Sequence, residues 1–114
     1  MYENLSAVDA VGYYPGKAKS LNANIISYIG LGEREKALRS ANKLYEIASS
    51  EGDDYYMGQA LLAKALSYAY LVFFEKALKI NKDAEVICRK IKDNDEFYSS
   101  LGQVYAGRAE IKHL

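Results

Sequence analysis

The chain has 114 residues, of which 50% are apolar and 26% charged, which suits one soluble domain with a modest core. Its 15 basic residues balance 15 acidic ones, so it lacks the positive field that attracts nucleic acid, and we expect no nucleic-acid partner. It has neither an apolar run of about 18 residues nor the basic and apolar regions of a secretory signal. We therefore expect no membrane partner.

The N-terminal part of the chain shows one weak and one strong helical pattern. Residues 1–11 resemble a short helix with an apolar stripe of Leu5, Val8 and Val11. A stronger helix is predicted to begin near Pro15, because proline suits the first turn of a helix, where its missing N–H is not needed.

Two glycine-containing runs predict the ends of the first two strong helices. The Gly-Leu-Gly run at 30–32 ends the helix that begins near Pro15, since glycine accepts the left-handed conformation. The second helix opens with Glu33 and Glu35, whose charges suit the positive end of a helix dipole. It stops in the Ser-Glu-Gly-Asp run at 50–53.

The third predicted helix begins at Asp53 or Asp54, because aspartate is a favoured N-cap residue. It is apolar nearly all round over residues 60–71. Such a helix is typical of the interior of a bundle, so we expect it to be the central, most buried element.

The fourth and fifth helices complete the predicted chain. The fourth spans about residues 74–91, with Lys90 and Lys92 in its last turn, where cations are favoured. The Asp-Asn-Asp run at 93–95 breaks the chain and caps a fifth helix over residues 97–111.

A short phrase recurs along the chain. The residues Glu-Lys-Ala-Leu at 35–38 return at 75–78, a spacing of 75 − 35 = 40 residues. A fixed period of this size is typical of stacked helical repeats. Short turns make each pair of helices an antiparallel hairpin, and stacking buries the face that one hairpin leaves open. We predict an all-α fold of stacked hairpins, with an irregular helical bundle as the alternative.

The spacing of aromatic and small residues resembles the tetratricopeptide repeat (TPR) family, in its long-repeat variety. Tyr28 precedes Ala37 by nine residues, Tyr68 precedes Ala77 by nine, and Tyr105 looks like the aromatic residue of a third copy. The resemblance implies a right-handed α-α superhelix of about two and a half repeats in a single domain. Its parts would be an N-terminal short helix or turn (1–14), repeat 1 (15–52), repeat 2 (53–92) and a half repeat (93–114).

In this family the first helix of each repeat lines a concave groove that binds a peptide or helix of a partner protein. By the family register, the groove-lining residues here would be Lys19, Asn22, Ile26, Ile29, Gln59, Leu62, Leu66, Tyr70, Ser99 and Gln103. This face mixes apolar and amide groups and carries little charge. Asn22 and Ile26 occupy the first two positions of the family's carboxylate clamp, so the clamp is not matched.

The turn before the second copy of the phrase is unusually apolar. It reads Leu-Val-Phe-Phe at 71–74, whereas the turn one period earlier reads Leu-Gly-Glu-Arg at 31–34. Phe73 and Phe74 cannot both face inward from one short turn. Either the N-terminal segment or the fifth helix covers them, or they form an interface patch with another subunit or protein.

Three candidates for chemistry have simpler explanations. His113 lies next to the end of the chain, where exposed tails are common. Cys88 stands where Ala48 stands one period earlier, so we expect a small buried side chain rather than a reactive thiol. The acidic runs at 53–54 and 93–95 suit helix caps better than metal ligands. We expect no enzymatic activity, no metal and no cofactor.

These patterns predict a protein–protein interaction module or scaffold, without enzymatic activity, that binds a peptide or helix of an unidentified partner. Because Cys88 is the one cysteine, no intramolecular disulfide can form, which favours a cytoplasmic location. One alternative is self-association, for example as a homodimer, because the third repeat lacks its second helix. Another is that the chain is a sensor fragment of a larger regulator.

Overall fold

Residues 13–114, which the computed structural model describes, form five helices and no strand. The helices are α2 (Tyr14–Gly30), α3 (Arg34–Glu51), α4 (Asp54–Tyr70), α5 (Phe74–Cys88) and α6 (Asn94–Lys112). The prediction of an all-α fold is therefore confirmed. The short helix expected over residues 1–11 lies outside the described residues.

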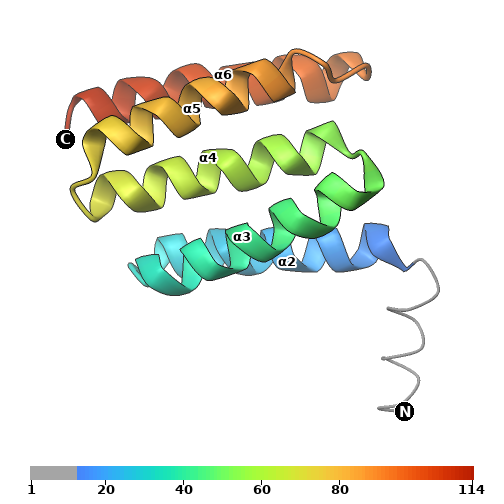
Figure 1. The fold of residues 1–114 in the computed structure, drawn as a ribbon, viewed down its shortest axis with the longest axis horizontal. Coiled ribbons are helices and arrows are strands. Elements are labelled where there is room, and N and C mark those ends of the chain that lie inside the picture. The colour runs from blue at the N-terminus through green and yellow to red at the C-terminus, as the bar shows by residue number, and fades with distance from the viewer. Residues whose placement is uncertain (1–12) are drawn as a thin grey trace, which may run out of the picture.

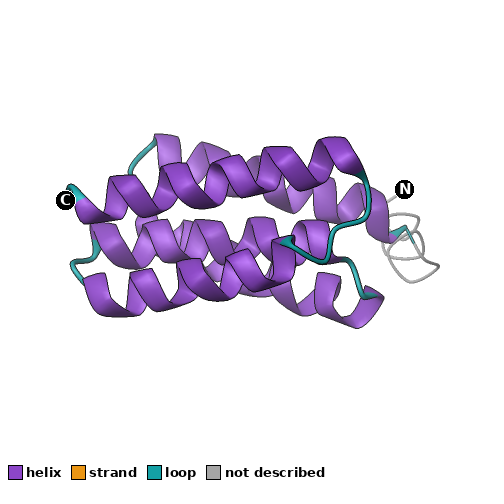
Figure 2. Ribbon diagram, turned by 90° about the horizontal axis from the view of Figure 1, so that it is seen from above, coloured by secondary structure: helices purple, strands orange, loops and turns teal. Residues whose placement is uncertain are grey.

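Consecutive helices form antiparallel hairpins that stack on one another, and the chain passes from α2 and α3 through α4 to α5 and α6 (Figure 1). Alternate helices also touch, since α2 contacts α4 and α4 contacts α6. The fold measures 46 × 32 × 19 Å, and its shortest dimension matches two layers of helices of about 10 Å each (Figure 2). Because α4 packs against all four other helices, it is the central element, as predicted.

The 40-residue period of the sequence is also the period of the helices. The start of α4 follows that of α2 by 54 − 14 = 40 residues, and the start of α5 follows that of α3 by 74 − 34 = 40 residues. The second hairpin therefore repeats the first position by position as far as Cys88, where α5 ends, and up to that point equivalent residues can be compared in the same local geometry.

Left-handed glycines end α2 and α3. Gly32 has φ 78° and Gly52 has φ 66°, a conformation that glycine adopts without a steric penalty. The backbone N–H of Glu33 donates to the carbonyl of Tyr28 at 2.8 Å, which satisfies a carbonyl that the helix end would leave free. Both predicted helix ends are confirmed.

Aspartate side chains cap the starts of α4 and α6. The Asp53 Oδ1 atom accepts a hydrogen bond from the N–H of Tyr56 at 3.1 Å. In the same way Asp93 Oδ1 accepts from the N–H of Glu96 at 2.9 Å. Each carboxylate satisfies one of the free donors at a helix N-terminus, so the predicted capping role is confirmed at both positions.

One predicted boundary is wrong, because α5 ends at Cys88 and Lys90 and Lys92 lie beyond its last turn. The chain tightens there, with the N–H of Lys90 donating to the carbonyl of Ile87 at 3.0 Å and the N–H of Ile91 to that of Cys88 at 3.1 Å. This turn places Ile91 in the core. Burying an isoleucine contributes about 1.5–3 kcal/mol, which exceeds the small propensity gain from extending an exposed helix end.

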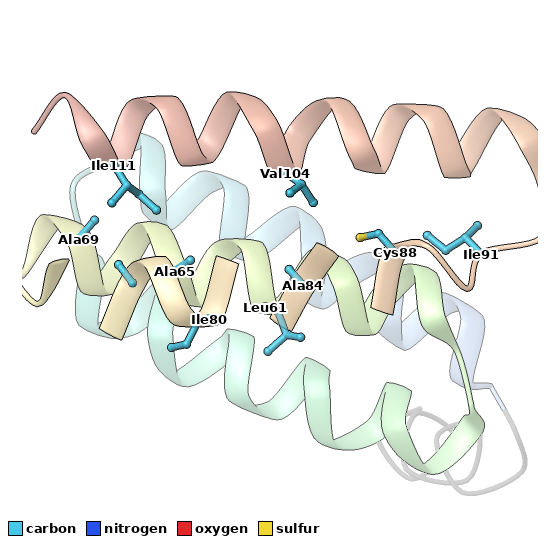
Figure 3. Packing of buried hydrophobic residues seen from close by; sticks show 10 residues of the cluster. Leu61, Ala65, Ala69, Ile80, Ala84, Cys88, Ile91, Val104 and Ile111 are labelled. Atoms are coloured by element: carbon cyan, nitrogen blue, oxygen red, sulfur yellow. The ribbon is translucent and has the colours of Figure 1, made fainter. Parts of the chain in front are cut away.

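The core consists of two clusters that share α4. One cluster joins α4, α5 and α6 (Figure 3), and the other joins α2, α3 and α4. Small side chains dominate both, including Ala60, Ala65, Ala77 and Ala84, each at most 1% exposed. Small residues let helix backbones approach closely, so the fold depends on tight contact rather than on large apolar side chains.

Candidate binding groove

Five of the residues predicted to line a groove lie together along α4 and α6. Gln59, Leu62, Leu66 and Tyr70 recur at helical spacing on one face of α4, and Gln103 faces them from α6. The Nε2 atom of Gln59 donates to Oε1 of Gln103 at 3.0 Å. This amide pair joins two helices that are separated by a complete helix in the sequence.

A pocket of about 230 Å³ lies between α4 and α6, next to this amide pair. Its apolar lining consists of Leu62, Ala65, Leu66, Ala106, Gly107 and Ile111, and its polar lining consists of Asn81, Gln103 and Glu110. Asn81 comes from α5 and is only 1% exposed, so it marks the deep side of the pocket. The space exists because Ala65, Ala106 and Gly107 are too small to fill it.

A second polar pair links the same two helices further along the groove. The Tyr70 hydroxyl donates to Glu110 Oε2 at 2.5 Å, and the guanidinium of Arg34 lies 4.9 Å from the centre of the Tyr70 ring. The hydrogen bond to Glu110 raises the pKa of Tyr70, because ionised Tyr70 would face a carboxylate. Tyr70 therefore stays a neutral donor, and Glu110 stays fixed at the pocket edge.

The remaining predicted groove residues lie outside this pocket. On α2, Lys19 and Ile26 are exposed and Asn22 is half-buried, whereas Ile29 packs against the buried cluster shared by α2, α3 and α4. Ser99 is exposed on α6. The structure thus separates the predicted groove into an α4–α6 part with a pocket and an α2 part that does not line it.

Sequence reasoning missed a partly buried chain of polar contacts that joins α5 to α6 behind the pocket. Asn81 donates from Nδ2 to the carbonyl of Val104 at 3.1 Å and accepts at Oδ1 from Nε of Arg108 at 2.8 Å. Arg108 donates in turn from Nη2 to Glu85 Oε1 at 2.8 Å. Both polar atoms of the Asn81 amide therefore have a hydrogen-bond partner in spite of its burial, as is usual for buried polar groups.

Glu85 is the charged centre of this chain of contacts. Its Oε2 atom accepts from Nη2 of Arg89 at 2.8 Å and from the hydroxyl of Tyr105 at 2.9 Å. Hydrogen bonds from Arg108, Arg89 and Tyr105 lower the pKa of Glu85 from 4.5 to about 2, because they favour its ionised form. The cluster holds α6, and with it one wall of the pocket, against α5.

Two signals in the sequence could have identified the pocket residues Gly107 and Glu110 and the buried Asn81. Gly107 and Glu110 follow Gln103 by four and seven residues, which places them on the same helix face. Asn81 occupies the position that Ala41 occupies one period earlier, and Ala41 is fully buried. A polar side chain in a buried slot requires partners, so the comparison of the two copies indicates a polar contact there.

The apolar turn between α4 and α5 is exposed. Val72 is 70% exposed, Phe73 57% and Phe74 38%, so the expectation that the fifth helix covers this turn is wrong. That helix is α6, and its core-facing side packs on α4 and α5 instead. The N-terminal segment, the other expected cover, lies outside the described residues.

The candidates for chemistry have the surroundings of ordinary structural residues. Cys88 is buried, and burial raises the pKa of its thiol, which opposes formation of a reactive thiolate. His113 is exposed at the end of α6. Among residues 13–114, His, Cys, Asp and Glu side chains form no group of three or more that could hold a metal ion. In the same part of the chain, no helix combines the length and apolar character needed to cross a bilayer.

Comparison of the chain with protein-family models, with curated proteins and with solved structures finds no match in any of the three. The two hairpins of the chain can nevertheless be compared with each other, because α4 and α5 repeat α2 and α3. Between the two copies, Asn81 replaces Ala41 beside the pocket, and Val72 replaces Gly32 in the exposed turn. The two copies therefore differ both beside the pocket and in the exposed turn.

Proposed function

We propose that the chain is a non-enzymatic, TPR-like interaction module that binds a segment of a partner protein along α4 and α6. The observation that carries the proposal is the pocket of about 230 Å³ between these helices, with a polar pair at each end. The TPR-like architecture is supported by the 40-residue period of the helices and by the serial contacts of α2, α4 and α6. A cytoplasmic location is part of the proposal, on the ground that Cys88 is a buried free thiol.

The pocket suits one bulky apolar side chain of the partner. Leu62, Leu66 and Ile111 supply apolar walls on both sides, and burial of a leucine-sized side chain contributes about 1.5–3 kcal/mol. Anchoring through one side chain in a preformed pocket is a common way for a groove to hold a peptide or helix. The amide groups of Gln59 and Gln103 beside the pocket can bond the partner's backbone or polar side chains.

The charge at the pocket favours a basic neighbour for the apolar anchor. Glu110 is the one charged residue among those that line the pocket, and its Oε2 atom already accepts from Tyr70. Its other oxygen can accept from a lysine or arginine of the partner, since a carboxylate has several acceptor sites. We therefore expect preferred segments to carry Lys or Arg within one helical turn of an apolar residue.

The proposal can be tested with a display library of random peptides. The parent protein is used to enrich binders, and the binders are then measured against Ala106→Trp, which places an indole at the pocket from an exposed position. We expect enriched peptides to contain the apolar and basic pair and to lose affinity on the order of tenfold or more with this variant. Glu110→Gln should weaken the same peptides less, and only those that carry the basic residue.

Ala109→Trp is the matched control, because Ala109 is exposed on the same helix but does not line the pocket. It should bind the enriched peptides as the parent does. The proposal fails if Ala106→Trp, folded by circular dichroism, binds the peptides as well as the parent. It also fails if the parent enriches no peptide above the background of an unrelated helical protein.

A further inference from the structure

The turn between α4 and α5 has the same backbone geometry as the turn between α2 and α3, but it contains a different residue at the critical position. Val72 has φ 66°, and Gly32, one period earlier, has φ 78°. The hydrogen bonds also match. The N–H of Phe73 donates to the carbonyl of Tyr68 at 2.8 Å, and in the first turn the N–H of Glu33 donates to the carbonyl of Tyr28 at the same distance. Val72 therefore adopts a glycine conformation with a β-branched side chain.

This conformation is costly for Val72. A left-handed backbone costs an L-residue about 1–2 kcal/mol, and a β-branched residue there is a genuine outlier. Val72 is 70% exposed, so its side chain gains little from contacts within the described chain. Full burial of a valine contributes about 1.5–3 kcal/mol, which is enough to offset the strain if another molecule covers the turn.

The side chains around Val72 form a prepared apolar surface, here called the Val72–Phe74 patch. The Phe73 ring is held edge-on against Tyr68, with ring centres 6.2 Å apart, and it still leaves 57% of its surface exposed. Next to it is a hollow of about 410 Å³ lined by residues 72–76. Because Phe73 is already oriented, little side-chain entropy is lost when a partner covers it.

We infer that the Val72–Phe74 patch is a contact between two copies of this chain, related by a twofold axis. A twofold interface requires a surface that is complementary to itself. The patch has the exposed Phe73 ring and an adjacent hollow. The acidic Glu75 and the basic Lys76, which are neighbours in the sequence, line the same hollow. Each charge can therefore face its opposite on the second copy. The chain as a whole is neutral, so no net charge repels two copies.

The size of the patch sets the expected strength of the contact. It consists of one turn and the first residues of α5, which places it at the small end of protein interfaces. Leu31 in the neighbouring turn is also exposed, and both turns lie at the end of the fold where the C-terminus lies (Figure 1). We therefore expect a concentration-dependent dimer that assembles end to end rather than an obligate one.

Light scattering and sedimentation across a concentration series measure this association. We expect the parent to shift from monomer to dimer as its concentration rises. Val72→Gly and Phe73→Ser should each raise the dimer dissociation constant on the order of tenfold or more. Val86→Ser is the control, because Val86 is an exposed apolar residue elsewhere on α5, and it should dimerise as the parent does.

A charge experiment identifies which surfaces meet. Glu75→Lys leaves two lysines in the hollow and Lys76→Glu leaves two glutamates, so each variant alone should be monomeric through like-charge repulsion. An equimolar mixture should recover dimers that contain one copy of each. Circular dichroism of each variant checks the fold, because Lys76→Glu also removes the contact of Lys76 with the Tyr68 ring at 4.4 Å.

Two results would overturn the inference. One is a parent that stays monomeric up to the solubility limit, since the patch would then belong to another occupant. The other is a parent that dimerises while folded Val72→Gly, Phe73→Ser and the charge variants dimerise equally well. Ala106→Trp should leave self-association unchanged, so failure of the groove proposal and failure of the patch proposal can be told apart.

Discussion

A Cβ atom at position 58 would lie 2.6 Å from the Sγ atom of Cys88. The thiol therefore occupies the space that a side chain at position 58 of α4 would need. Both residues are buried. The contact gives a physical reason for a glycine inside this helix, where glycine costs about 1 kcal/mol relative to alanine.

The first prediction follows from this contact. Gly58→Ala should destabilise the fold by roughly 1 kcal/mol, because overpacking costs about 1–3 kcal/mol and the better helix propensity of alanine returns about 1 kcal/mol. In a Cys88→Ala background the same change should become neutral or stabilising, since Sγ is gone. Chemical denaturation of the parent, the two single variants and the double variant measures the free energies of unfolding that make up this double-mutant cycle. Gly102→Ala, where nothing lies within 4 Å of the added Cβ, should stabilise in either background.

A second prediction concerns the strain at Val72. At concentrations too low for self-association, Val72→Gly should stabilise the fold by about 0.5–1 kcal/mol. Relief of the left-handed strain, about 1–2 kcal/mol, exceeds the extra unfolded-state entropy of glycine, about 0.4–1 kcal/mol. The reverse change in the equivalent turn, Gly32→Val, should destabilise the fold. Equal denaturation midpoints for the parent and both variants would contradict the strain argument.

A third prediction is a pH dependence at Glu85. Its folded pKa of about 2 lies below the ordinary 4.5, so the unfolded state takes up the proton first as the pH falls. The contribution of Glu85 is therefore present above about pH 4.5 and is lost between pH 4.5 and 2. Its side chain is 21% exposed, so we expect Glu85→Gln to cost only about 1–2 kcal/mol at neutral pH. The variant should lose less stability than the parent over that acid range.

Glu96 is the matched control for the pH experiment, because its pKa is raised whereas that of Glu85 is lowered. Desolvation, followed by the charges of Asp93 and Asp53, raises its pKa. A raised carboxyl pKa favours the folded state at low pH, and this contribution is lost as the pH rises through the folded pKa. Glu96→Gln should therefore not reduce stability at neutral pH. A loss as large as that of Glu85→Gln would show that the pH effect is not specific to the α5–α6 cluster.

The fourth prediction compares two helix caps. Asp53 caps α4 and also accepts from the hydroxyl of Tyr14 at 2.6 Å, whereas Asp93 caps α6 and has no second side-chain hydrogen bond among residues 13–114. Asp93→Ala should cost about 1 kcal/mol, the usual value of a lost cap. Asp53→Ala should cost about 1 kcal/mol more, because the Tyr14 hydroxyl also loses its acceptor. Tyr14→Phe should remove most of the difference, as measured by thermal or chemical unfolding.

Much of the fold could be read from local features. Pro15, Gly32, Asp53 and Asp93 mark helix boundaries in the structure as they do in the sequence. These residues act through backbone conformation and hydrogen bonds within a few positions, so their effect hardly depends on the rest of the chain. The end of α5 was missed because burial of Ile91, a tertiary effect, decided it.

The candidate site was only partly predictable. The register of the resembled family placed Gln59, Leu62 and Leu66 on the groove face, but it could not show that α6 approaches that face closely enough to form a pocket. The hydrogen-bond partners of Asn81 lie 23 and 27 positions further along the chain. No local pattern contains that information, because side chains on different helices meet only after the hairpins stack.

By itself, then, the sequence determined the all-α class, the 40-residue period and most of the helix boundaries, since each depends on neighbouring residues. The tertiary structure decided three things that depend on contacts between distant residues. It separated the α4–α6 pocket from the α2 face, it joined Glu85 to Arg108 across α5 and α6, and it left Val72 strained and largely exposed among residues 13–114. Such contacts are decided by how the helices pack, and packing is a property of the whole chain.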